Sequence, residues 1–599
     1  MIYHCEDHTC NYWDEGEKLP ERCPQCGRKL LRANEADMTG DDWTALGNTL
    51  WDAEASDKKR MVDCFRKAAY LGSAWGVCNL GICMEQGNGV EADPVQAFWL
   101  YQQAVEMGSL NAVCCLGVCY QYGIGTAPDA KQAAELYCKA AEYGSPRGQM
   151  LLARAFHDGI GVEADAAEAV YWVRAAAYQR YGEGMHRLGV CYAYGDGVEQ
   201  NWEHAVHWFR EAAESGVSVA MTDLGYCYEK GCGVEQSWEQ AFSWYRRGAE
   251  CGYPVSMSNL GLCYKRGYGV EQNWQEAIKW YEQGAQCGDL QSMHNLACCY
   301  ERGEGVEQNE ERALYWYRRS AEGGNGDAMC NLGRCYERGY GVEQNWQEAV
   351  KWYEQGAQCG NLQSMHNLAC CYEHGEGVEQ NMTEAIRWYT AAAEGGNADA
   401  MHDLGWHYDH GEGVEQDMKK AICWYERAAE QNHPAAMNSL GECYAMGRGV
   451  PRDLETAMEW YRRAAELGEA MADYNMGWHL EQAGKLSEAY AHYRKAADGN
   501  DDSAWWALGR FYENGVVVAQ DGKEARRCYE TGEKLGSVKC KMRLARCKLL
   551  GIGGRRAKKA GLDLCRQALE LAKESSEKED YGYEAEMNLL RRTIAENES

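Results

Sequence analysis

The sequence repeats itself with a period of 36 residues. A leucine followed by glycine or alanine marks each copy, with a first step of 34 residues and one later step of 32. Fifteen copies at such a period are typical of stacked helical or mixed supersecondary units, and not of one central core. We call the marking residues the repeat leucines: Leu46, Leu80, Leu116, Leu152, Leu188, Leu224, Leu260, Leu296, Leu332, Leu368, Leu404 and Leu440, continued by Met476, Leu508 and Leu544.

Each copy predicts a pair of short helices. In the copy around Leu260, the residues Leu260, Gly261 and Tyr264 fall on one helical face, and Tyr281 and Gly284 do so in the second half. Small residues at Gly261 and Gly284 allow two helices to pack about 8–10 Å apart. Because one such hairpin cannot bury its apolar face alone, the copies are expected to stack into an α-solenoid.

The ends of these helices are also visible in the sequence. Asn273 is placed as an N-cap, with Glu276 three residues later as a capping-box partner. Pro94 follows Asp93 at the equivalent point of another copy, where a helix tolerates proline. The Gly-x-Gly pairs between the two halves, such as Gly267-Tyr268-Gly269, predict turns.

The pattern Leu-Gly-x-x-Tyr, Gly-x-Gly-Val, Ala-x-x-Trp-Tyr-x-x-Ala-Ala-Glu resembles the Sel-one-like repeat (SLR) family of the tetratricopeptide-like superfamily. The resemblance implies an all-α, right-handed superhelical α-solenoid of about fifteen helix hairpins that acts as an adaptor or scaffold for other proteins. We therefore expect two parts, a small metal knot over residues 1–33 and the repeat solenoid over residues 34–599, which ends in a capping helix near Tyr583–Asn597.

Residues 1–33 do not follow the repeat. Cys23-Pro-Gln-Cys26-Gly is a zinc-knuckle sequence, and Cys5 and Cys10 would supply the other two thiolates. The segment is similar to rubredoxin-like zinc ribbons. Four residues separate Cys5 from Cys10, however, whereas two residues separate the corresponding cysteines of such ribbons. His4 or His8 is therefore an alternative ligand, and iron is the alternative to a structural Zn²⁺, because four thiolates suit both metals.

Charge and cysteine content limit the partners and the compartment. The formal net charge of −30 argues against broad binding of nucleic acid or of an anionic membrane, and no apolar stretch is long enough to span a bilayer. Ten of the 30 cysteines fall three residues after a repeat leucine, where they are expected to be buried and unpaired. We expect a cytoplasmic protein, since reduced thiols belong to a reducing compartment.

The first helix of each pair is expected to line a concave groove, as in the superfamily that the chain resembles. Asparagines stand directly before several repeat leucines, and histidines stand two residues before four of the repeat leucines. An amide both donates and accepts hydrogen bonds, so a column of them can hold an extended peptide without reading its sequence; the alternative is that these side chains only bond to neighbouring helices. The candidate partner-binding residues are Asn259, Asn295, Asn331, Asn367, His294, His366 and His402.

We predict a protein-interaction scaffold or adaptor that binds a peptide segment or a protein domain in this groove. The sequence shows no phosphate loop, nucleophile elbow or His-Glu-x-x-His pair, so we expect no enzyme. The alternative is a regulatory adaptor of nucleic-acid-linked machinery, acting through the zinc ribbon and the basic stretch 538–566. The oligomeric state and the identity of the partner stay open.

Overall fold

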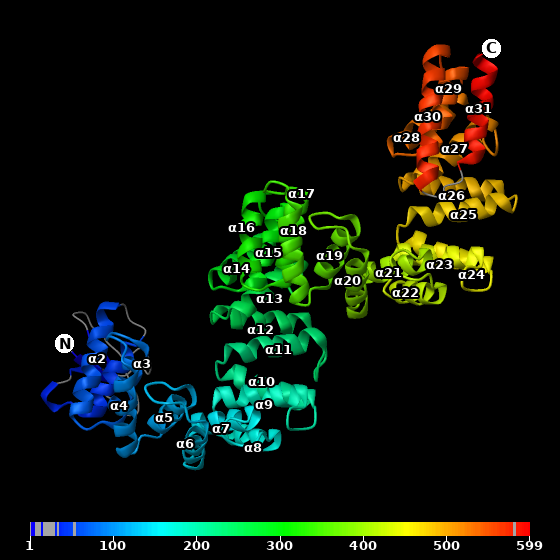
Figure 1. Cartoon of the computed structure of the whole chain (residues 1–599). Helices are drawn as coiled ribbons and strands as arrows, with labels where there is room; N and C mark the ends of the chain where they lie inside the picture. The colour runs from blue at the N-terminus through cyan, green and yellow to red at the C-terminus, as the bar shows by residue number, and fades with distance from the viewer. Residues whose placement is uncertain are drawn as a thin grey trace. The chain divides into compact units, whose positions relative to one another are not determined.

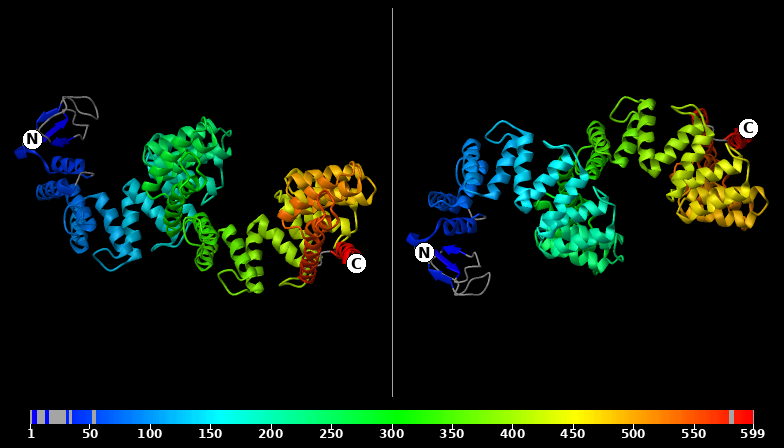
Figure 2. Two further views of the ribbon diagram at one scale, coloured as in Figure 1. Left: turned by 90° about the horizontal axis from the view of Figure 1, so that it is seen from above. Right: turned by 90° about the horizontal axis from the view of Figure 1, so that it is seen from below.

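The structure is a computed structural model that describes residues 2–5, 13–15, 30–32, 35–51, 55–578 and 583–598. Its internal contacts divide the chain into two compact units, Met1–Asn309 and Glu310–Ser599, and each unit is considered by itself below. Within each unit the hairpins lie beside one another in chain order, so that the colour changes steadily along the ribbon (Figure 1; Figure 2).

In the described residues, thirty helices alternate as the first and second helices of the repeats, and a single helix closes the series. The division between the two units falls between α15 and α16. The first helices of the hairpins are α1 (Gly40–Thr49), α3 (Ala74–Gln86), α5 (Leu110–Tyr122), α7 (Pro146–Asp158), α9 (Gly182–Tyr194), α11 (Ser218–Lys230), α13 (Pro254–Arg266), α15 (Leu290–Arg302), α17 (Gly326–Arg338), α19 (Leu362–His374), α21 (Ala398–His410), α23 (Pro434–Met446), α25 (Ala470–Gln482), α27 (Asp502–Asn514) and α29 (Val538–Leu550). The second helices are α2 (Ala55–Tyr70), α4 (Pro94–Glu106), α6 (Ala130–Glu142), α8 (Ala166–Tyr178), α10 (Trp202–Glu214), α12 (Trp238–Glu250), α14 (Trp274–Gln286), α16 (Glu310–Glu322), α18 (Trp346–Gln358), α20 (Met382–Gly395), α22 (Met418–Glu430), α24 (Leu454–Glu466), α26 (Leu486–Asp498), α28 (Gly522–Lys534) and α30 (Lys558–Lys578). The last helix is α31 (Glu584–Glu598), which packs on α29 and α30.

The α-solenoid of repeated helix pairs is therefore confirmed, while the handedness of the superhelix stays a prediction. Among the described residues, no helix is both long enough and apolar enough to cross a membrane.

Three short strands precede the helices. Strand β1 (Ile2–Cys5) pairs antiparallel with β2 (Trp13–Glu15) and with β3 (Leu30–Arg32), in the order β2-β1-β3. In this register Cys5 lies opposite Leu30. A 3₁₀ turn, η1 (Glu35–Asp37), leads from the sheet into α1.

The N-cap and the turns of this hairpin follow the sequence prediction, while the reciprocal capping-box bond of Glu276 stays a prediction. The side chain of Asn273 accepts a hydrogen bond of 3.2 Å from the backbone N–H of Glu276 and begins α14. Gly267 ends α13 in the left-handed region, at φ +74°. Gly269 has φ +69°, and a β-carbon on it would lie 2.2 Å from the carbonyl oxygen of Trp238 in the preceding hairpin. This glycine is therefore required both by its backbone conformation and by the close approach of two hairpins.

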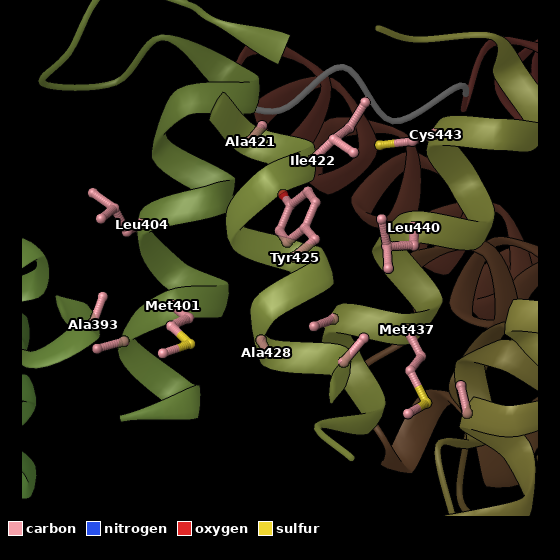
Figure 3. Close-up of a cluster of buried hydrophobic side chains, with 14 of the residues drawn as sticks. Ala393, Met401, Leu404, Ala421, Ile422, Tyr425, Ala428, Met437, Leu440 and Cys443 are labelled. Atoms are coloured by element: carbon pink, nitrogen blue, oxygen red, sulfur yellow. The ribbon is translucent and has the colours of Figure 1, made fainter. Parts of the chain in front are cut away.

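The core is a layer of small and aromatic side chains shared between neighbouring hairpins. Figure 3 shows Tyr425 in one such cluster, with Leu404 of its own hairpin on one side and Leu440 and Cys443 of the next hairpin on the other. Tyr425 is 1% exposed and the three others are no more exposed than that. Each hairpin thus completes its core only by packing on the next, as a solenoid requires.

Candidate functional site

The candidate site is the face formed by the first helices of successive hairpins. These helices contact one another directly, α5 with α7, α11 with α13 and α13 with α15 in the first unit, and α17 with α19 and α27 with α29 in the second. First helices therefore touch one another across the intervening second helix within each unit. The concave groove that the sequence led us to expect for the partner-binding columns stays a prediction.

On this face, side chains of neighbouring hairpins are joined by polar contacts that we call rungs. In each rung, the residue two before one repeat leucine contacts the residue directly before the next repeat leucine. The rungs are His186–Asp223 at 2.7 Å, Cys330–Asn367 at 3.6 Å, His366–Asp403 at 2.9 Å, His402–Ser439 at 3.5 Å and Asn438–Asn475 at 3.0 Å. The asparagine and histidine columns of the sequence are therefore two ends of one set of contacts.

All seven predicted partner-binding residues lie on the first helices and all are half-buried. The Gln363 amide donates to Asn367 at 3.0 Å and lies 3.3 Å from the His366 ring nitrogen. Gln291 makes the same contacts with Asn295 and His294, at 3.3 Å each. Asn331 accepts a bond from Arg334 at 3.0 Å, while Asn259 is half-buried on α13 and His402 lies 3.0 Å from Asp403. Part of each column thus bonds to neighbouring side chains, which is the alternative that the sequence left open.

The sequence missed Asp403 as a partner of the histidines. Its carboxylate contacts His366 from the next hairpin, and Cys370 Sγ lies 3.9 Å from the same imidazole nitrogen. Burial by itself would lower the pKa of His366, but the hydrogen bonds to Asp403 and Cys370 raise that pKa to about 10. Burial acts to raise the pKa of Asp403, and the bonds from His366 and His402 hold it below its usual range. The aspartates that stand 37 residues after His186 and His366 are the signal that could have revealed these pairs.

His366, Cys370 and Asp403 also place three possible metal-ligand atoms within 4.8 Å of one another. Histidines alone, at one per hairpin, are too sparse for chelation, as the sequence indicates. The structure adds two ligand types to one of these histidines. His366 lies near Cys370, one turn later in the same helix, and near Asp403 of the next hairpin. A nitrogen, a sulfur and an oxygen of this kind could hold a divalent metal such as Zn²⁺.

The predicted N-terminal metal ligands lie mostly outside the described residues. This holds for Cys10, Cys23 and Cys26, and of Cys5 only the backbone in β1 is described. The zinc site accordingly stays a prediction.

The cysteine column of the repeats is buried as expected. The thiols three residues after the repeat leucines are at most 3% exposed, and all 26 cysteines whose side chains the structure describes are free thiols. Burial raises the pKa of Cys263 to about 12. These groups act as small core side chains.

The basic C-terminal stretch is partly neutralised within the fold. Arg543 donates to Glu586 of α31 at 2.6 and 2.8 Å and to Glu513 at 3.3 Å, and Arg546 also bonds to Glu513. Asp563 is the one acidic residue within the stretch, but arginines of the stretch also pair with the acidic residues Glu513 and Glu586 outside it. Arg555, Arg556, Lys558 and Lys559 remain on the surface.

Comparison with known proteins agrees with this architecture. The Sel1 repeat matches the chain at residues 76–109, 112–145, 146–181, 182–217, 218–253, 254–289, 290–325, 326–361, 362–397, 398–433, 434–469, 470–501 and 504–537. The fold and the inner face define a helical-repeat solenoid of the tetratricopeptide-like type. The chain belongs to the Sel1 repeat family.

Two solved Sel1-type structures share about a third of their residues with this chain. A protective antigen of uropathogenic Escherichia coli with an SLR fold is 32% identical, over 75% of this chain and 97% of that one, with a TM-score of 0.51. A Sel1 repeat protein from Oxalobacter formigenes is also 32% identical, over 41% of this chain and 96% of that one, with a TM-score of 0.37. No curated protein matches the chain.

Proposed function

We propose that this protein is an interaction scaffold that binds a peptide segment or a protein domain on the face of its first helices. Sel1 and tetratricopeptide-like repeat proteins generally serve as protein-interaction scaffolds. The observation that supports this face is the series of half-buried rungs, exemplified by His366–Asp403 and Cys330–Asn367. Such side chains recur at one spacing along consecutive helices, so they can meet an extended chain at regular intervals.

The chemistry of the rungs suits a peptide backbone. An asparagine amide carries two donors and two acceptor lone pairs, which is more than one rung uses. In one rung, Asn475 donates to both Asn438 and Glu442, and its amide oxygen takes no part in either bond. Backbone N–H and C=O groups of a bound segment are matched to such groups, which gives affinity without strong sequence selectivity.

The proposed scaffold has a cytoplasmic location and carries a structural Zn²⁺ on Cys5, Cys10, Cys23 and Cys26. It performs no catalytic step. The free thiols of the described residues suit a reducing compartment. Zinc in the N-terminal segment would fix its loops and would leave no open coordination position.

The test is chemical crosslinking in native lysate, read by mass spectrometry, with three full-length baits. One is the unchanged chain, and the second carries Asn259, Asn295, Asn331 and Asn367 as alanines. The third, a matched control, carries the exposed loop residues Glu271, Glu307, Glu343 and Glu379 as glutamines. Partners that crosslink to the first helices of the unchanged chain and of the control, but are lost from the asparagine variant, support the proposal. Partners lost only from the glutamate variant place binding at the loop edge and contradict it.

The second candidate is an adaptor of nucleic-acid-linked machinery. It is supported by the surface cluster Arg555, Arg556, Lys558 and Lys559, whereas Arg543 and Arg546 are paired internally. Within this cluster, Arg556 also donates to Asn597 and to the Leu549 carbonyl. Retention on immobilised nucleic acid should then fall steeply with salt and disappear when the four cluster residues become glutamine. Absence of retention at low salt removes this candidate.

A further inference from the structure

Most hairpins keep one buried tyrosine in the second helix. These tyrosines are Tyr101, Tyr137, Tyr245, Tyr281, Tyr317, Tyr353, Tyr389, Tyr425, Tyr461, Tyr493 and Tyr529, and each is at most 1% exposed. We call them the tyrosine column. Each of these rings is fully enclosed, so the surrounding side chains of its hairpin and of the neighbouring hairpin leave a space that the ring fills.

The surroundings of one such ring are well defined. The Tyr245 ring lies against Gly225 of its own hairpin, where an added β-carbon would come within 2.6 Å of it. Its hydroxyl donates to Glu229 at 2.8 Å, near the end of the same first helix. Burial, the Glu229 carboxylate and then the thiol of Cys263 raise the pKa of Tyr245, and Cys263 belongs to the next hairpin. Three positions therefore surround the ring: a glycine, an acidic residue and a cysteine from the following hairpin.

The hairpin of α7 and α8 interrupts the column. At the tyrosine position it carries Val173, at the glycine position Ala153 and at the acidic position His157. The cysteine position of the next hairpin is retained as Cys191. One added methyl group on Ala153 fills much less space than the lost phenol ring, so this exchange leaves room.

A pocket of about 380 Å³ occupies this place. Ala153, His157, Val173 and Cys191 all line it, and these are the four positions that enclose the tyrosine in other hairpins. Met150 adds a further apolar wall from α7. The pocket is thus the vacated site of a tyrosine side chain.

The rim of the pocket is polar and carries charges of both signs, including the Glu183 carboxylate. His157 Nδ1 lies 2.6 Å from Asp158 and its Nε2 lies 3.4 Å from Asp196. Arg154 donates to Asp158 at 3.3 Å and Arg187 to Asp196 at 3.1 Å. Two arginines and three carboxylates at the rim disfavour a simple anion. The rim suits a ring that carries a hydroxyl group, since guanidinium groups stack on aromatic faces and carboxylates accept from a phenol.

The rim also joins the candidate site. Arg187 stands directly before the repeat leucine Leu188, which is the position that asparagine takes in other hairpins. Its side chain is 38% exposed, so the mouth of the pocket opens to solvent beside the rungs. A segment bound along the first helices would pass this mouth.

We propose that the pocket between α7, α8 and α9 binds a tyrosine side chain of the peptide segment that lies on the first-helix face. The ring takes the place that the chain's own tyrosine takes in other hairpins, against Ala153 and Val173, and the hydroxyl meets the polar rim. This proposal rests on the proposed scaffold function, because the peptide must lie on that face. It gives the scaffold one selective position within an otherwise unselective surface.

The test uses the full-length chain and a short peptide, acetyl-Gly-Gly-Tyr-Gly-Gly-amide, with 3-fluorotyrosine at its centre. Fluorine NMR line broadening measures its binding, which for one buried side chain is expected in the millimolar range. Changing Ala153→Gly, Val173→Tyr and His157→Glu together restores the column and fills the pocket. The matched control is Phe209→Tyr with Ala193→Glu, which makes the same change of chemistry in the next hairpin, where Phe209 already fills the site.

The peptide should bind the unchanged chain and the control with equal affinity. Its affinity for the filled variant should be lower by a factor of about ten or more. An unlabelled peptide with leucine in place of tyrosine should compete poorly. Val173→Leu, a smaller filling change, serves if the triple variant fails to fold. Equal binding by the filled variant, equal competition by the leucine peptide, or no binding at all overturns the proposal. So does binding of free 4-fluorophenol without binding of the peptide, which would identify a site for a small phenol.

The outcome is separable from that of the crosslinking experiment. The asparagine variant keeps the pocket intact, and the pocket variants keep the asparagines. Loss of partners from the asparagine variant with no peptide binding at the pocket would leave the scaffold standing and remove only the tyrosine site.

Discussion

The hydroxyl group of Tyr101 donates a hydrogen bond of 2.6 Å to the carboxylate of Glu85, across the two helices of one hairpin. Tyr101 is fully buried, so the carboxylate satisfies a donor that water cannot reach. Where the second helix carries Phe209 instead, the facing residue is Ala193. In that hairpin the donor and the acceptor are therefore absent together.

Changing Glu85→Ala alone should destabilise this hairpin by about 1–3 kcal/mol, because it leaves the Tyr101 hydroxyl buried without an acceptor. The double change with Tyr101→Phe should recover most of that loss. Native-state hydrogen exchange of α3 and α4 is the measurement, since a long repeat array does not unfold in one step. A double variant no more stable than Glu85→Ala would show that the pair contributes in another way.

Asp501 should make the hairpin of α27 and α28 less stable as the pH rises. Its side chain caps α27 by accepting from the Ala504 N–H at 2.6 Å, and burial raises its pKa to about 6. A carboxyl whose folded pKa is raised contributes its full stability below about pH 4, near its ordinary pKa, and loses it as the pH rises through about 6. Asp501→Asn keeps the capping oxygen and removes the titration.

Hydrogen exchange of α27 should therefore be slower in Asp501→Asn than in the unchanged chain at pH 8. The free energy of local opening should differ by about 1 kcal/mol at pH 8, and it should not differ at pH 4. Asp521→Asn, at the exposed cap of α28, controls for the loss of one negative charge. The same difference at both pH values would exclude titration of Asp501 as its cause.

Thiol reagents should distinguish two classes of cysteine. The exposed ones, Cys251, Cys287, Cys359 and Cys423, should react rapidly with iodoacetamide in the folded protein. Column residues such as Cys263 should react far more slowly, because burial raises the thiol pKa and limits access. Peptide mapping by mass spectrometry gives the rates, and unfolding should equalise them. Reaction of Cys263 at the rate of Cys251 in the folded chain would contradict the buried column.

Glu586 should be required to hold the last helix in place. It is buried and accepts from both Arg543 and Trp506, so Glu586→Ala leaves the Arg543 guanidinium with fewer partners. Removing one member of a buried pair costs about 3–5 kcal/mol. Limited proteolysis should cut near α31 much faster in this variant. Asp563→Asn, which breaks the exposed pair with Arg566, should change the rate little; equal acceleration by both would deny the special role of Glu586.

The N-terminal segment should contain one zinc ion per chain. Cys23→Ser should abolish the bound metal measured by elemental mass spectrometry, while Cys263→Ser should leave it unchanged. A disulfide between the N-terminal cysteines would contradict the prediction, and iron in their place would identify the alternative metal.

The sequence by itself determined the period, the number of hairpins, the helix caps and the buried cysteine column. These features depend on residues near one another in the chain, where the 3.6-residue period and the hydrogen-bonding groups of Asn273 or Gly267 act locally. Stacking followed from the sequence as well, because one hairpin cannot bury its apolar face alone. The family resemblance is what pointed to the first helices as the partner-binding face.

Only the tertiary structure decided which side chains meet. His366 and Asp403 stand 37 residues apart, and Arg543 and Glu586 stand 43 apart, so their contacts depend on how one hairpin packs on another. The pocket at Val173 is a stronger case, because in the sequence it is only a valine where other copies have tyrosine. The packing of α7, α8 and α9 decides whether neighbouring residues fill the space of the missing ring or leave it open. No local sequence pattern determines the separation of these three helices.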